Sequence, residues 1–386
     1  MKICMVAACL AGGGAERALL DTAILLRARN HDVSVLTFEG RGADAYTVPE
    51  YLNRMTLDVQ GQSGNRLRGV VNNLRRIRRL RTAITRLRPD VVVSYLTRTN
   101  IICLLALLGT NYPVVATEHN AATLNDSPML PFWQFLKRFL YPHMAQVVIV
   151  SKGMARHYSW LSGKKLAVIH NFLPPDRGGE PETFEFISDE SRYIVGMGRL
   201  APEKRFDRLI RAFQLIEKDC PGWKLLIAGE GPLRADLTRL IASLELQNKV
   251  MLPGRVRNPR TFFKRCDMFA LSSETEGFSL VLLEAMSAAI PVVSFDCDFG
   301  PREIITPGLS GLLVPPGDTD ALALAIKGLV DDGAMRARLG AAGHDVLDQF
   351  SPHTIMDQWE ALLLSVAAGG AALAQHGRRE ESVEKA

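Results

Sequence analysis

The 386-residue sequence lacks an apolar run long enough to span a bilayer, which takes about 20 residues as a helix. The longest candidate is IICLLALL at residues 101–108, and we expect it to be a core element. Cysteine is scarce, and the six cysteines show neither paired nor metal-type spacing, as expected of reduced cytosolic thiols. With 47% hydrophobic and 23% charged residues, the composition excludes a disordered chain and suits a soluble globular protein of two domains.

Dinucleotide and metal signatures are also missing. The glycine cluster AGGGAER at residues 11–17 lacks the G-x-G-x-x-G spacing, so a nicotinamide enzyme is disfavoured. What Gly12, Gly13 and Gly14 do offer is close approach of the backbone to a ligand, because glycine has no side chain to clash. No cluster of ligand side chains with metal-type spacing stands out, so we expect neither a metal ion nor a cofactor.

Positive charge is concentrated early in the chain. Residues 1–172 hold 22 Lys and Arg against 10 Asp and Glu, whereas the remainder holds 24 against 31. Nine arginines lie between Asn65 and Arg88, where apolar residues recur at helical spacing. Such a helix suits a solvated charged face, nucleic acid or anionic lipid, but no recognition module or aromatic platform supports nucleic acid. We therefore expect no nucleic acid and favour an anionic membrane surface.

Apolar strands alternate with helical segments through most of the chain, which predicts parallel α/β sheets. A stretch rich in Pro, Gly and acids, residues 171–191, interrupts the pattern and predicts a linker. We expect an N-terminal Rossmann-like domain over residues 1–172 and a second over residues 173–351. Residues 352–386 are expected to form an amphipathic helix up to Leu364, followed by a frayed or disordered tail beyond Ala367.

The most informative stretch runs from Phe269 to Pro316. It predicts a strand ending at Leu271, a polar loop carrying Glu276, and a helix that starts near Ser279 and contains Glu284. In α/β sheets, the loops after the carboxyl ends of the strands form the ligand crevice. EGFSLVLLEAMSAAIPVV within this stretch resembles the E-G-F-x-L-x-x-x-E-A-M-x-x-x-x-P-V-V signature of retaining GT-B glycosyltransferases, family 4 type (group 1 glycosyltransferases).

A second segment, YIVGMGRLAPEKRFDRLIRAF at residues 193–213, resembles the same family's G-R-L-x-x-x-K pattern. Arginine can bond two phosphate oxygens in a planar fork and lysine adds a compact cation, which suits a nucleotide diphosphate. The resemblance implies two Rossmann-like domains facing a central cleft, with the last helix crossing back to the first domain. It assigns the donor to these residues: Gly13, Gly14, Arg199, Lys204, Gly231, Arg255, Val256, Glu276, Gly277, Phe278, Ser279, Leu280 and Glu284.

Within that set, Arg199 and Lys204 would hold the diphosphate, Glu276 the sugar hydroxyls, and Glu284 the ribose hydroxyls. The segment VVATEHN places His119 after a buried strand, and the resemblance assigns this histidine to the donor sugar near the reacting carbon. A half-buried histidine without a catalytic role is the alternative. Glu118 and Asn120 beside it could orient His119 or contact the acceptor.

The sequence thus predicts a metal-independent retaining transferase that moves a hexosyl unit from a nucleotide-sugar to a glycan or polyprenyl-diphosphate-linked acceptor. DCDFGPREII at residues 296–305 resembles family members that use UDP-hexoses or UDP-N-acetylhexosamines, while a GDP-mannose-dependent mannosyltransferase stays open. Two competing interpretations are a nucleotide-sugar 2-epimerase and a non-catalytic sugar- or lipid-binding protein. The expected location is cytoplasmic, peripheral on the inner face of the membrane.

Overall fold

The computed structural model describes residues 1–59, 66–119, 130–173 and 183–383, and it divides the chain into two compact units. Unit 1 comprises Met1–Asn171 and Pro352–Ala386, and unit 2 comprises Phe172–Ser351. Phe172 therefore belongs to the second unit, one residue earlier than the predicted boundary. Each unit contains one parallel β-sheet with helices packed on it, which confirms the predicted α/β class.

The sheet of unit 1 runs β3-β2-β1-β4-β5-β6-β7, with every pair of neighbours parallel. Its inner strands are buried along almost their whole length, which explains why KICMVA and VVVSY read as continuous apolar runs. The strands are β1 (Lys2–Ala7), β2 (Asp32–Thr37), β3 (Asn53–Thr56), β4 (Val91–Tyr95), β5 (Val114–Glu118), β6 (Gln146–Ile149) and β7 (Leu166–Val168).

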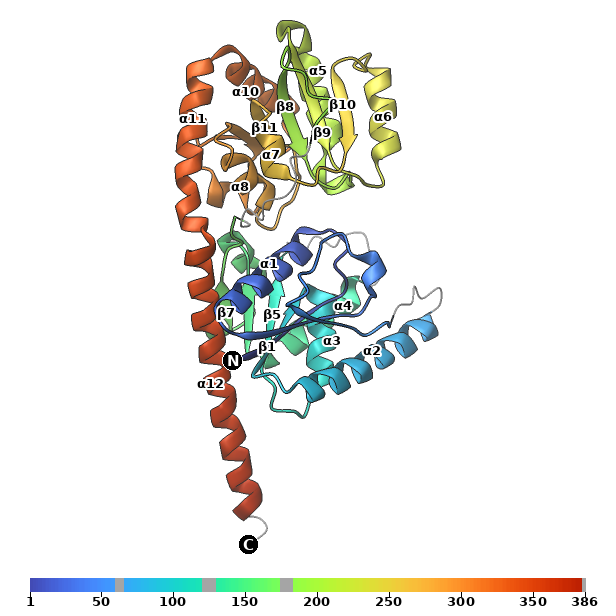
Figure 1. The fold of residues 1–386 in the computed structure, drawn as a ribbon, viewed down its shortest axis with the longest axis vertical. Helices are drawn as coiled ribbons and strands as arrows, with labels where there is room; N and C mark the ends of the chain where they lie inside the picture. The colour runs from blue at the N-terminus through green and yellow to red at the C-terminus, as the bar shows by residue number, and fades with distance from the viewer. Residues whose placement is uncertain (60–65, 120–129, 174–182, 384–386) are drawn as a thin grey trace. The chain divides into compact units, whose positions relative to one another are not determined.

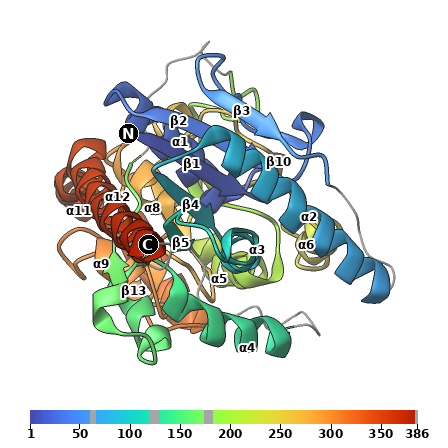
Figure 2. The same ribbon diagram turned by 90° about the horizontal axis from the view of Figure 1, so that it is seen from below.

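Helices of unit 1 form two groups. Helix α3 (Thr97–Leu107) packs between α2 (Arg66–Leu87) and α4 (Leu130–Leu140), and Figure 2 shows α2 and α4 on either side of it. Helix α1 (Gly14–Ala28) packs against α12 (Pro352–Val383), as can be followed in Figure 1. The predicted helix over residues 65–88 thus corresponds to α2.

Helix α12 differs from the prediction. It continues to Val383, whereas the sequence predicted a helix ending at Leu364 and a frayed tail beyond Ala367. The tail is rich in alanine and free of proline, and alanine is the strongest helix former. Near its start, α12 is bonded to the end of α1, because Arg29 Nη1 lies 2.6 Å from Asp357 Oδ1 and 2.9 Å from Glu360 Oε2.

The sheet of unit 2 runs β10-β9-β8-β11-β12-β13, again all parallel. Its strands are β8 (Arg192–Met197), β9 (Trp223–Ala228), β10 (Val250–Gly254), β11 (Met268–Leu271), β12 (Val292–Phe295) and β13 (Leu312–Val314). Its helices are α5 (Phe206–Ile216), α6 (Arg234–Ser243), α7 (Pro259–Phe263), α8 (Leu280–Met286), α9 (Pro301–Ile304), α10 (Thr319–Asp331) and α11 (Gly333–Asp345).

The strand order of each sheet reverses once, between β1 and β4 in unit 1 and between β8 and β11 in unit 2. Loops diverge at such a point and leave a crevice beyond the carboxyl ends of the two strands, where α/β proteins bind ligands. The G-R-L-x-x-x-K segment follows β8 and the glutamate-bearing loop follows β11, so both predicted donor segments meet there. Among the described helices, none combines the length and apolar character needed to cross a membrane.

Candidate functional site

The loops after β8 and β11 are bonded to each other in unit 2. The Glu274 backbone N–H donates to the Glu203 carbonyl at 2.8 Å, and the Ser272 hydroxyl donates to the Lys204 carbonyl at 2.9 Å. Arg205 adds a side-chain bridge, because its Nη1 lies 3.2 Å from Glu274 Oε2. Two hydrogen bonds and one ion pair therefore hold the two predicted donor segments together.

At the centre of this arrangement, Lys204 Nζ donates to Glu276 Oε1 at 2.6 Å. The two side chains are 19% and 8% exposed, so most of the ion pair is withdrawn from water. Arg199 leaves the same loop five residues earlier and is exposed. The site thus presents one partly buried lysine, positioned by a carboxylate, and one arginine that is accessible to a ligand.

Glycines of the loop after β9 allow it to pack against the loop after β8. A Cβ atom at Gly229 would overlap the backbone of Gly198, and one at Gly231 would overlap the backbone of Leu200. Leu200 N–H donates to the Glu230 carbonyl at 3.0 Å, which closes the contact. The resemblance placed Gly231 in the donor site, near the nucleotide base, but it did not foresee this contact between loops about 30 positions apart.

The loop after β10 continues this edge of the sheet. The Gly229 N–H donates to the Gly254 carbonyl at 2.7 Å, which joins the loops after β9 and β10. Arg255, which follows directly, is exposed, and Val256 is partly buried. Both of these predicted donor-site residues therefore lie at the same edge of the sheet as Arg199 and Lys204.

The turn Gly277-Phe278-Ser279 connects Glu276 to α8. Ser279 has φ 64° and the helix begins at Leu280, close to the predicted start. Phe278 is buried against Phe350 with ring centroids 5.3 Å apart, so its side chain serves the core and only its backbone remains for a ligand. Glu284 lies in α8 and is 5% exposed.

The loop after β12 supports this turn, which sequence reasoning did not foresee. Gly300 has φ +87°, and a Cβ there would come within 3.0 Å of the Phe278 backbone. Burial, together with the negative charge of Glu276, raises the pKa of Cys297 to about 12, so the thiol stays protonated near the Lys204–Glu276 pair. The sequence signal was available in DCDFGP, a polar and glycine-containing break after an apolar strand.

The same loop contains a D-x-D pair, Asp296 and Asp298, which the expectation of a metal-free site overlooked. Such a pair after a strand is a common place for a divalent ion. Here, however, Arg302 Nε donates to Asp296 Oδ1 at 2.9 Å and Arg302 Nη2 bonds the other oxygen. Within the described part of the chain, no group of three or more His, Cys, Asp or Glu side chains could hold a metal ion.

His119 lies directly after β5 in unit 1. It is 7% exposed and stacks on Tyr95, with ring centroids 5.1 Å apart. Neither ring nitrogen has a hydrogen-bond partner among the described residues. Burial lowers the pKa of His119 to about 3, so the imidazole is neutral near pH 7 and can offer one donor and one acceptor but no positive charge.

Glu118 is the last residue of β5, and its side chain is buried. It is 2% exposed and accepts hydrogen bonds from the hydroxyls of Thr97, at 2.9 Å, and Tyr141. Lys137 Nζ lies 3.5 Å from its Oε1 atom. These interactions assign Glu118 to the interior of unit 1, contrary to the predicted acceptor contact, while Asn120 lies outside the described residues.

The glycine cluster lies at the start of α1 in unit 1. Gly13 precedes the helix and Gly14 is its first residue. The Tyr46 hydroxyl donates to the Gly13 carbonyl at 3.2 Å, and a Cβ at Gly13 would overlap the Glu16 carboxylate. The backbone therefore runs close to the first turn of its own helix, and a side chain at Gly13 would displace that carboxylate.

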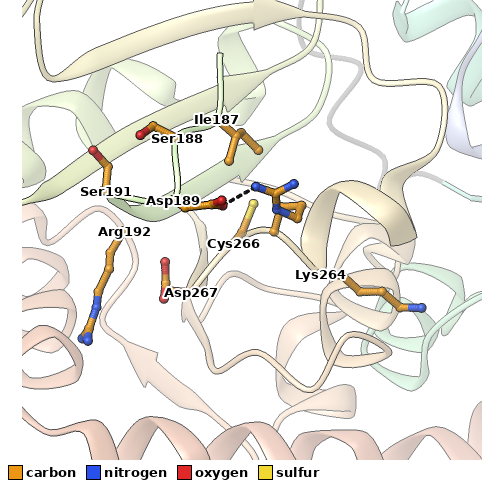
Figure 3. Close-up of a pocket in the computed structure, with 9 residues that line it drawn as sticks. Ile187, Ser188, Asp189, Ser191, Arg192, Lys264, Cys266 and Asp267 are labelled. Carbon is orange, nitrogen blue, oxygen red and sulfur yellow. Dashed lines mark hydrogen bonds and ion pairs between the residues drawn. The ribbon is translucent and has the colours of Figure 1, made fainter. Parts of the chain in front are cut away.

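A shallow hollow lies at the opposite edge of the unit 2 sheet, before β8 and β11. Figure 3 shows residues that line it. An ion pair lies in this lining, because Arg265 Nη2 is 2.6 Å from Asp189 Oδ1. Its lining includes Arg192, the first residue of β8, and Asp267, the residue before β11. The donor segments follow the carboxyl ends of the same strands, so this hollow is not the predicted site.

Two family models match most of the chain. The model described as Glycosyltransferase Family 4 matches residues 12–177, and the one described as Glycosyl transferases group 1 matches residues 182–346. They cover most of unit 1 and most of unit 2 in turn. The two segments predicted from sequence to hold the diphosphate and the sugar both lie within the second match.

Two relatives come from Campylobacter jejuni. One, named as the α-1,4-N-acetyl-D-galactosaminyltransferase for GalNAc-α-(1→4)-GalNAc-α-(1→3)-diNAcBac-PP-undecaprenol, is 27% identical over 95% of this chain and 99% of its own. The other, named as N-acetylgalactosamine-N,N'-diacetylbacillosaminyl-diphospho-undecaprenol 4-α-N-acetylgalactosaminyltransferase, is 31% identical. That alignment covers 64% of this chain and 68% of the relative.

Solved structures share the fold at lower identity. Sucrose-phosphate synthase from Thermosynechococcus elongatus superposes with a TM-score of 0.81 at 17% identity, over 95% of this chain and 99% of that one. The Anabaena protein HepE, solved in complex with UDP-glucose, superposes with a TM-score of 0.77 at 20% identity, over 95% and 100%.

Proposed function

Because the chain belongs to the group 1 glycosyltransferases and has their GT-B fold, we propose that it transfers a hexosyl unit from a UDP-sugar to a glycan or lipid-linked acceptor, with retention of configuration. The observation that carries this proposal is the Lys204–Glu276 pair beside the exposed Arg199 at the switch point of unit 2. It combines cations for a leaving diphosphate with a carboxylate for sugar hydroxyls.

The proposed reaction breaks the bond between the sugar C1 carbon and the diphosphate oxygen. The acceptor hydroxyl oxygen bonds C1 on the same face, and its proton passes to the departing diphosphate. Negative charge builds up on that diphosphate, where fixed positive charge stabilises the transition state most strongly. We assign this role to Arg199 and Lys204, the sugar hydroxyls to Glu276 and the ribose hydroxyls to Glu284.

His119 is proposed to contact the transferred sugar as a neutral imidazole. A cationic residue there would stand beside the positive charge that develops on the sugar ring. Because burial holds the pKa of His119 near 3, the side chain avoids that repulsion at physiological pH. It can still form a hydrogen bond to a sugar hydroxyl with either ring nitrogen.

UDP is the proposed nucleotide, and names of relatives and neighbours support the choice. HepE was solved with UDP-glucose, and both Campylobacter relatives are named as N-acetylgalactosaminyltransferases of undecaprenyl-diphosphate-linked glycans. The same names support a polyprenyl-diphosphate-linked acceptor and a role in glycolipid or polysaccharide assembly. A GDP-mannose donor is the alternative among transferases.

Thermal unfolding in the presence of UDP, GDP and ADP tests the donor. A ligand present at a hundredfold excess over its Kd stabilises the folded state by about 2.7 kcal/mol. For a unit of this size that corresponds to a rise in Tm of about 5–10 °C. We expect the rise with UDP alone. A larger shift with GDP would favour a GDP-mannose-dependent mannosyltransferase over a UDP-sugar transferase. The absence of a shift with any of the three nucleotides would contradict the donor site.

Incubation with the donor alone separates the transferase from a 2-epimerase on the same fold. Slow hydrolysis of the UDP-sugar is expected, because water can replace the missing acceptor at C1. Appearance of the 2-epimer in the nucleotide-sugar pool would instead show epimerase chemistry. If neither product forms although UDP binds, the result would support a binding protein without transferase activity.

Activity is expected to survive excess EDTA. The physical reason is that Arg199 and Lys204 supply the positive charge that a divalent ion would otherwise provide, and Arg302 already bonds Asp296. Initial rates with and without EDTA check this expectation. Loss of activity that Mg²⁺ or Mn²⁺ restores would move the leaving-group role to a metal ion at Asp296 and Asp298.

We further propose that α2 docks unit 1 on an anionic membrane, at the inner face of the cytoplasmic membrane. Three arginines of this helix already bond backbone carbonyls: Arg76 to Val59, Arg79 to Leu57 and Arg81 to Ala106. Among the described side chains, Arg75, Arg78 and Arg86 are exposed and lie on one face of the helix. These three are the candidates for contact with lipid headgroups.

Replacing Arg75, Arg78 and Arg86 with glutamine is expected to weaken binding to phosphatidylglycerol vesicles. Each basic residue near an anionic surface contributes about 1 kcal/mol, so the triple variant should lose roughly 100-fold in affinity at low salt. Co-sedimentation across a salt series measures the effect, which should vanish as the charges are screened. Glutamine at Arg211, Lys218 and Arg239 of unit 2 is the control and should change nothing. Equal losses in both variants would contradict a specific role for α2.

A further inference from the structure

Helix α4 exposes three phenylalanines on one side. Phe132, Phe135 and Phe139 are 50%, 69% and 66% exposed, and their spacing of three and four residues places them on one face of the helix. We call these three residues the α4 aromatic face. Isolated exposed apolar side chains are ordinary, but a contiguous patch of large ones marks a surface for a partner or a membrane.

The buried side of α4 keeps this face turned outward. Lys137 points into unit 1, where its Nζ atom donates to the Tyr158 hydroxyl at 2.7 Å and lies 3.5 Å from Glu118 Oε1. Its ammonium also lies 4.5 Å from the centroid of the Tyr158 ring. A rotation that buried the phenylalanines would withdraw the Lys137 charge from these partners, so their exposure is part of the fold.

Charge around the α4 aromatic face identifies the partner. Residues 127–175 contain no Asp or Glu, and they contain five Lys and Arg besides the buried Lys137. Arg138 is exposed at the edge of the face, with its guanidinium 5.6 Å from the Trp160 ring, and Arg98 of α3 lies 5.4 Å from the Trp133 ring. Two copies of this chain joined face to face would bring like charges together, which opposes a symmetric dimer.

An anionic bilayer surface suits this chemistry. Phenylalanine side chains enter the boundary between headgroups and acyl chains, tryptophan rings prefer the headgroup level, and arginines pair with anionic phosphates. The mechanism differs from the one at α2, because apolar insertion does not weaken with salt, whereas attraction between charges does. The two helices belong to the same group, packed on either side of α3 (Figure 2).

We propose that the α4 aromatic face inserts into the interfacial layer of an anionic membrane and anchors unit 1 there. The buried Lys137–Glu118 contact links this helix to the carboxyl end of β5, one residue before His119. Insertion would therefore hold the His119 segment close to the lipid surface. The benefit to catalysis rests on the proposed lipid-linked acceptor, whereas insertion itself can be measured without any acceptor.

The test uses the full chain with vesicles of phosphatidylglycerol and phosphatidylcholine at about 0.5 M salt. The Debye length is then only about 4 Å, so attraction between charges is largely screened. The parent protein should remain bound, and Phe135→Ser/Phe139→Ser should lose at least tenfold in affinity. Leu215→Ser/Leu324→Ser, which removes two exposed leucines of unit 2 (53% and 71% exposed), is the matched control and should bind as the parent does. Equal binding of all three proteins would overturn the proposal.

A second measurement keeps the result interpretable. Phe139→Trp should be quenched by lipids brominated near the headgroup end of the acyl chain more strongly than the parent protein. Donor hydrolysis and the UDP-induced rise in Tm should be unchanged in the serine variant, so failure of insertion and failure of the proposed function give different results. The parent protein could prove to be a dimer and the serine variant a monomer with unchanged vesicle binding. That result would show that the α4 aromatic face is a self-association surface, and it would contradict insertion.

Discussion

Replacement of Arg199 or Lys204 by alanine is expected to lower kcat by about 10²–10³, which corresponds to about 2.7–4 kcal/mol of lost transition-state stabilisation. The reason is that, in the proposed reaction, each side chain donates a charged hydrogen bond to the departing diphosphate, whose negative charge is greatest in the transition state. Initial rates with saturating donor measure the effect. A larger loss in kcat than in donor affinity would identify an interaction made mainly in the transition state.

The two positions differ in how cleanly they test this role. Arg199 is exposed, so its removal should leave the fold intact. Lys204 bonds Glu276 at 2.6 Å, and Lys204→Ala would leave the Glu276 carboxylate, which is only 8% exposed, without this cation. Lys218→Ala, which removes an exposed cation from the turn after α5, is the matched control for net charge. Near-normal turnover in a folded Arg199→Ala enzyme would exclude the diphosphate assignment.

The second large effect is expected in the interior of unit 1. Lys137 and Glu118 are 6% and 3% exposed, and neither can reach water without disturbing α4 or β5. Lys137→Met keeps the length of the side chain but leaves the Glu118 charge buried without its cation. Breaking a buried pair in this way costs about 3–5 kcal/mol. Hydrogen exchange of the β5 and β6 amides should show a corresponding fall in the free energy of opening.

Two further variants make this prediction specific. Lys137→Met combined with Glu118→Gln removes both charges and should recover much of the loss, because no unpaired charge stays buried. Arg265→Met removes a surface pair with Asp189, whose side chains are 47% and 93% exposed. That change should cost no more than about 1 kcal/mol. If Lys137→Met were as mild as Arg265→Met, Glu118 and Lys137 would not form an energetically important pair.

Much of the fold could be read from the sequence because the signals are local. Strands buried on both faces appear as short apolar runs, and the intervening helices show helical periodicity, so the end of β11 and the start of α8 were predicted within a few residues. The positions of Glu276 and Arg199 followed from the same reasoning, since both lie in loops directly after such strands. Their proximity also followed, because the carboxyl ends of parallel strands share one edge of a sheet.

Errors arose where the outcome depends on distant residues. Glu118 follows an apolar strand beside His119, which suggested a ligand contact, but its partners Thr97, Tyr141 and Lys137 come from three other segments of unit 1. Gly300 gives no local sign that it must admit the Phe278 backbone. The Ala, Gly and charged residues beyond Ala367 predict a frayed tail, whereas α12 continues to Val383.

The sequence by itself determined the α/β architecture and the family resemblance, because period, spacing and loop position are properties of neighbouring residues. The donor-site residues stay a prediction that the resemblance implies. Only the tertiary structure decided which side chains of those segments are free to act. In α4, Gln134, Lys137 and Arg138 lie on one side of LPFWQFLKRFL and the phenylalanines lie on the other, so periodicity alone would turn the phenylalanines toward the core. The buried partners of Lys137 make that choice, and they leave the phenylalanines in solvent.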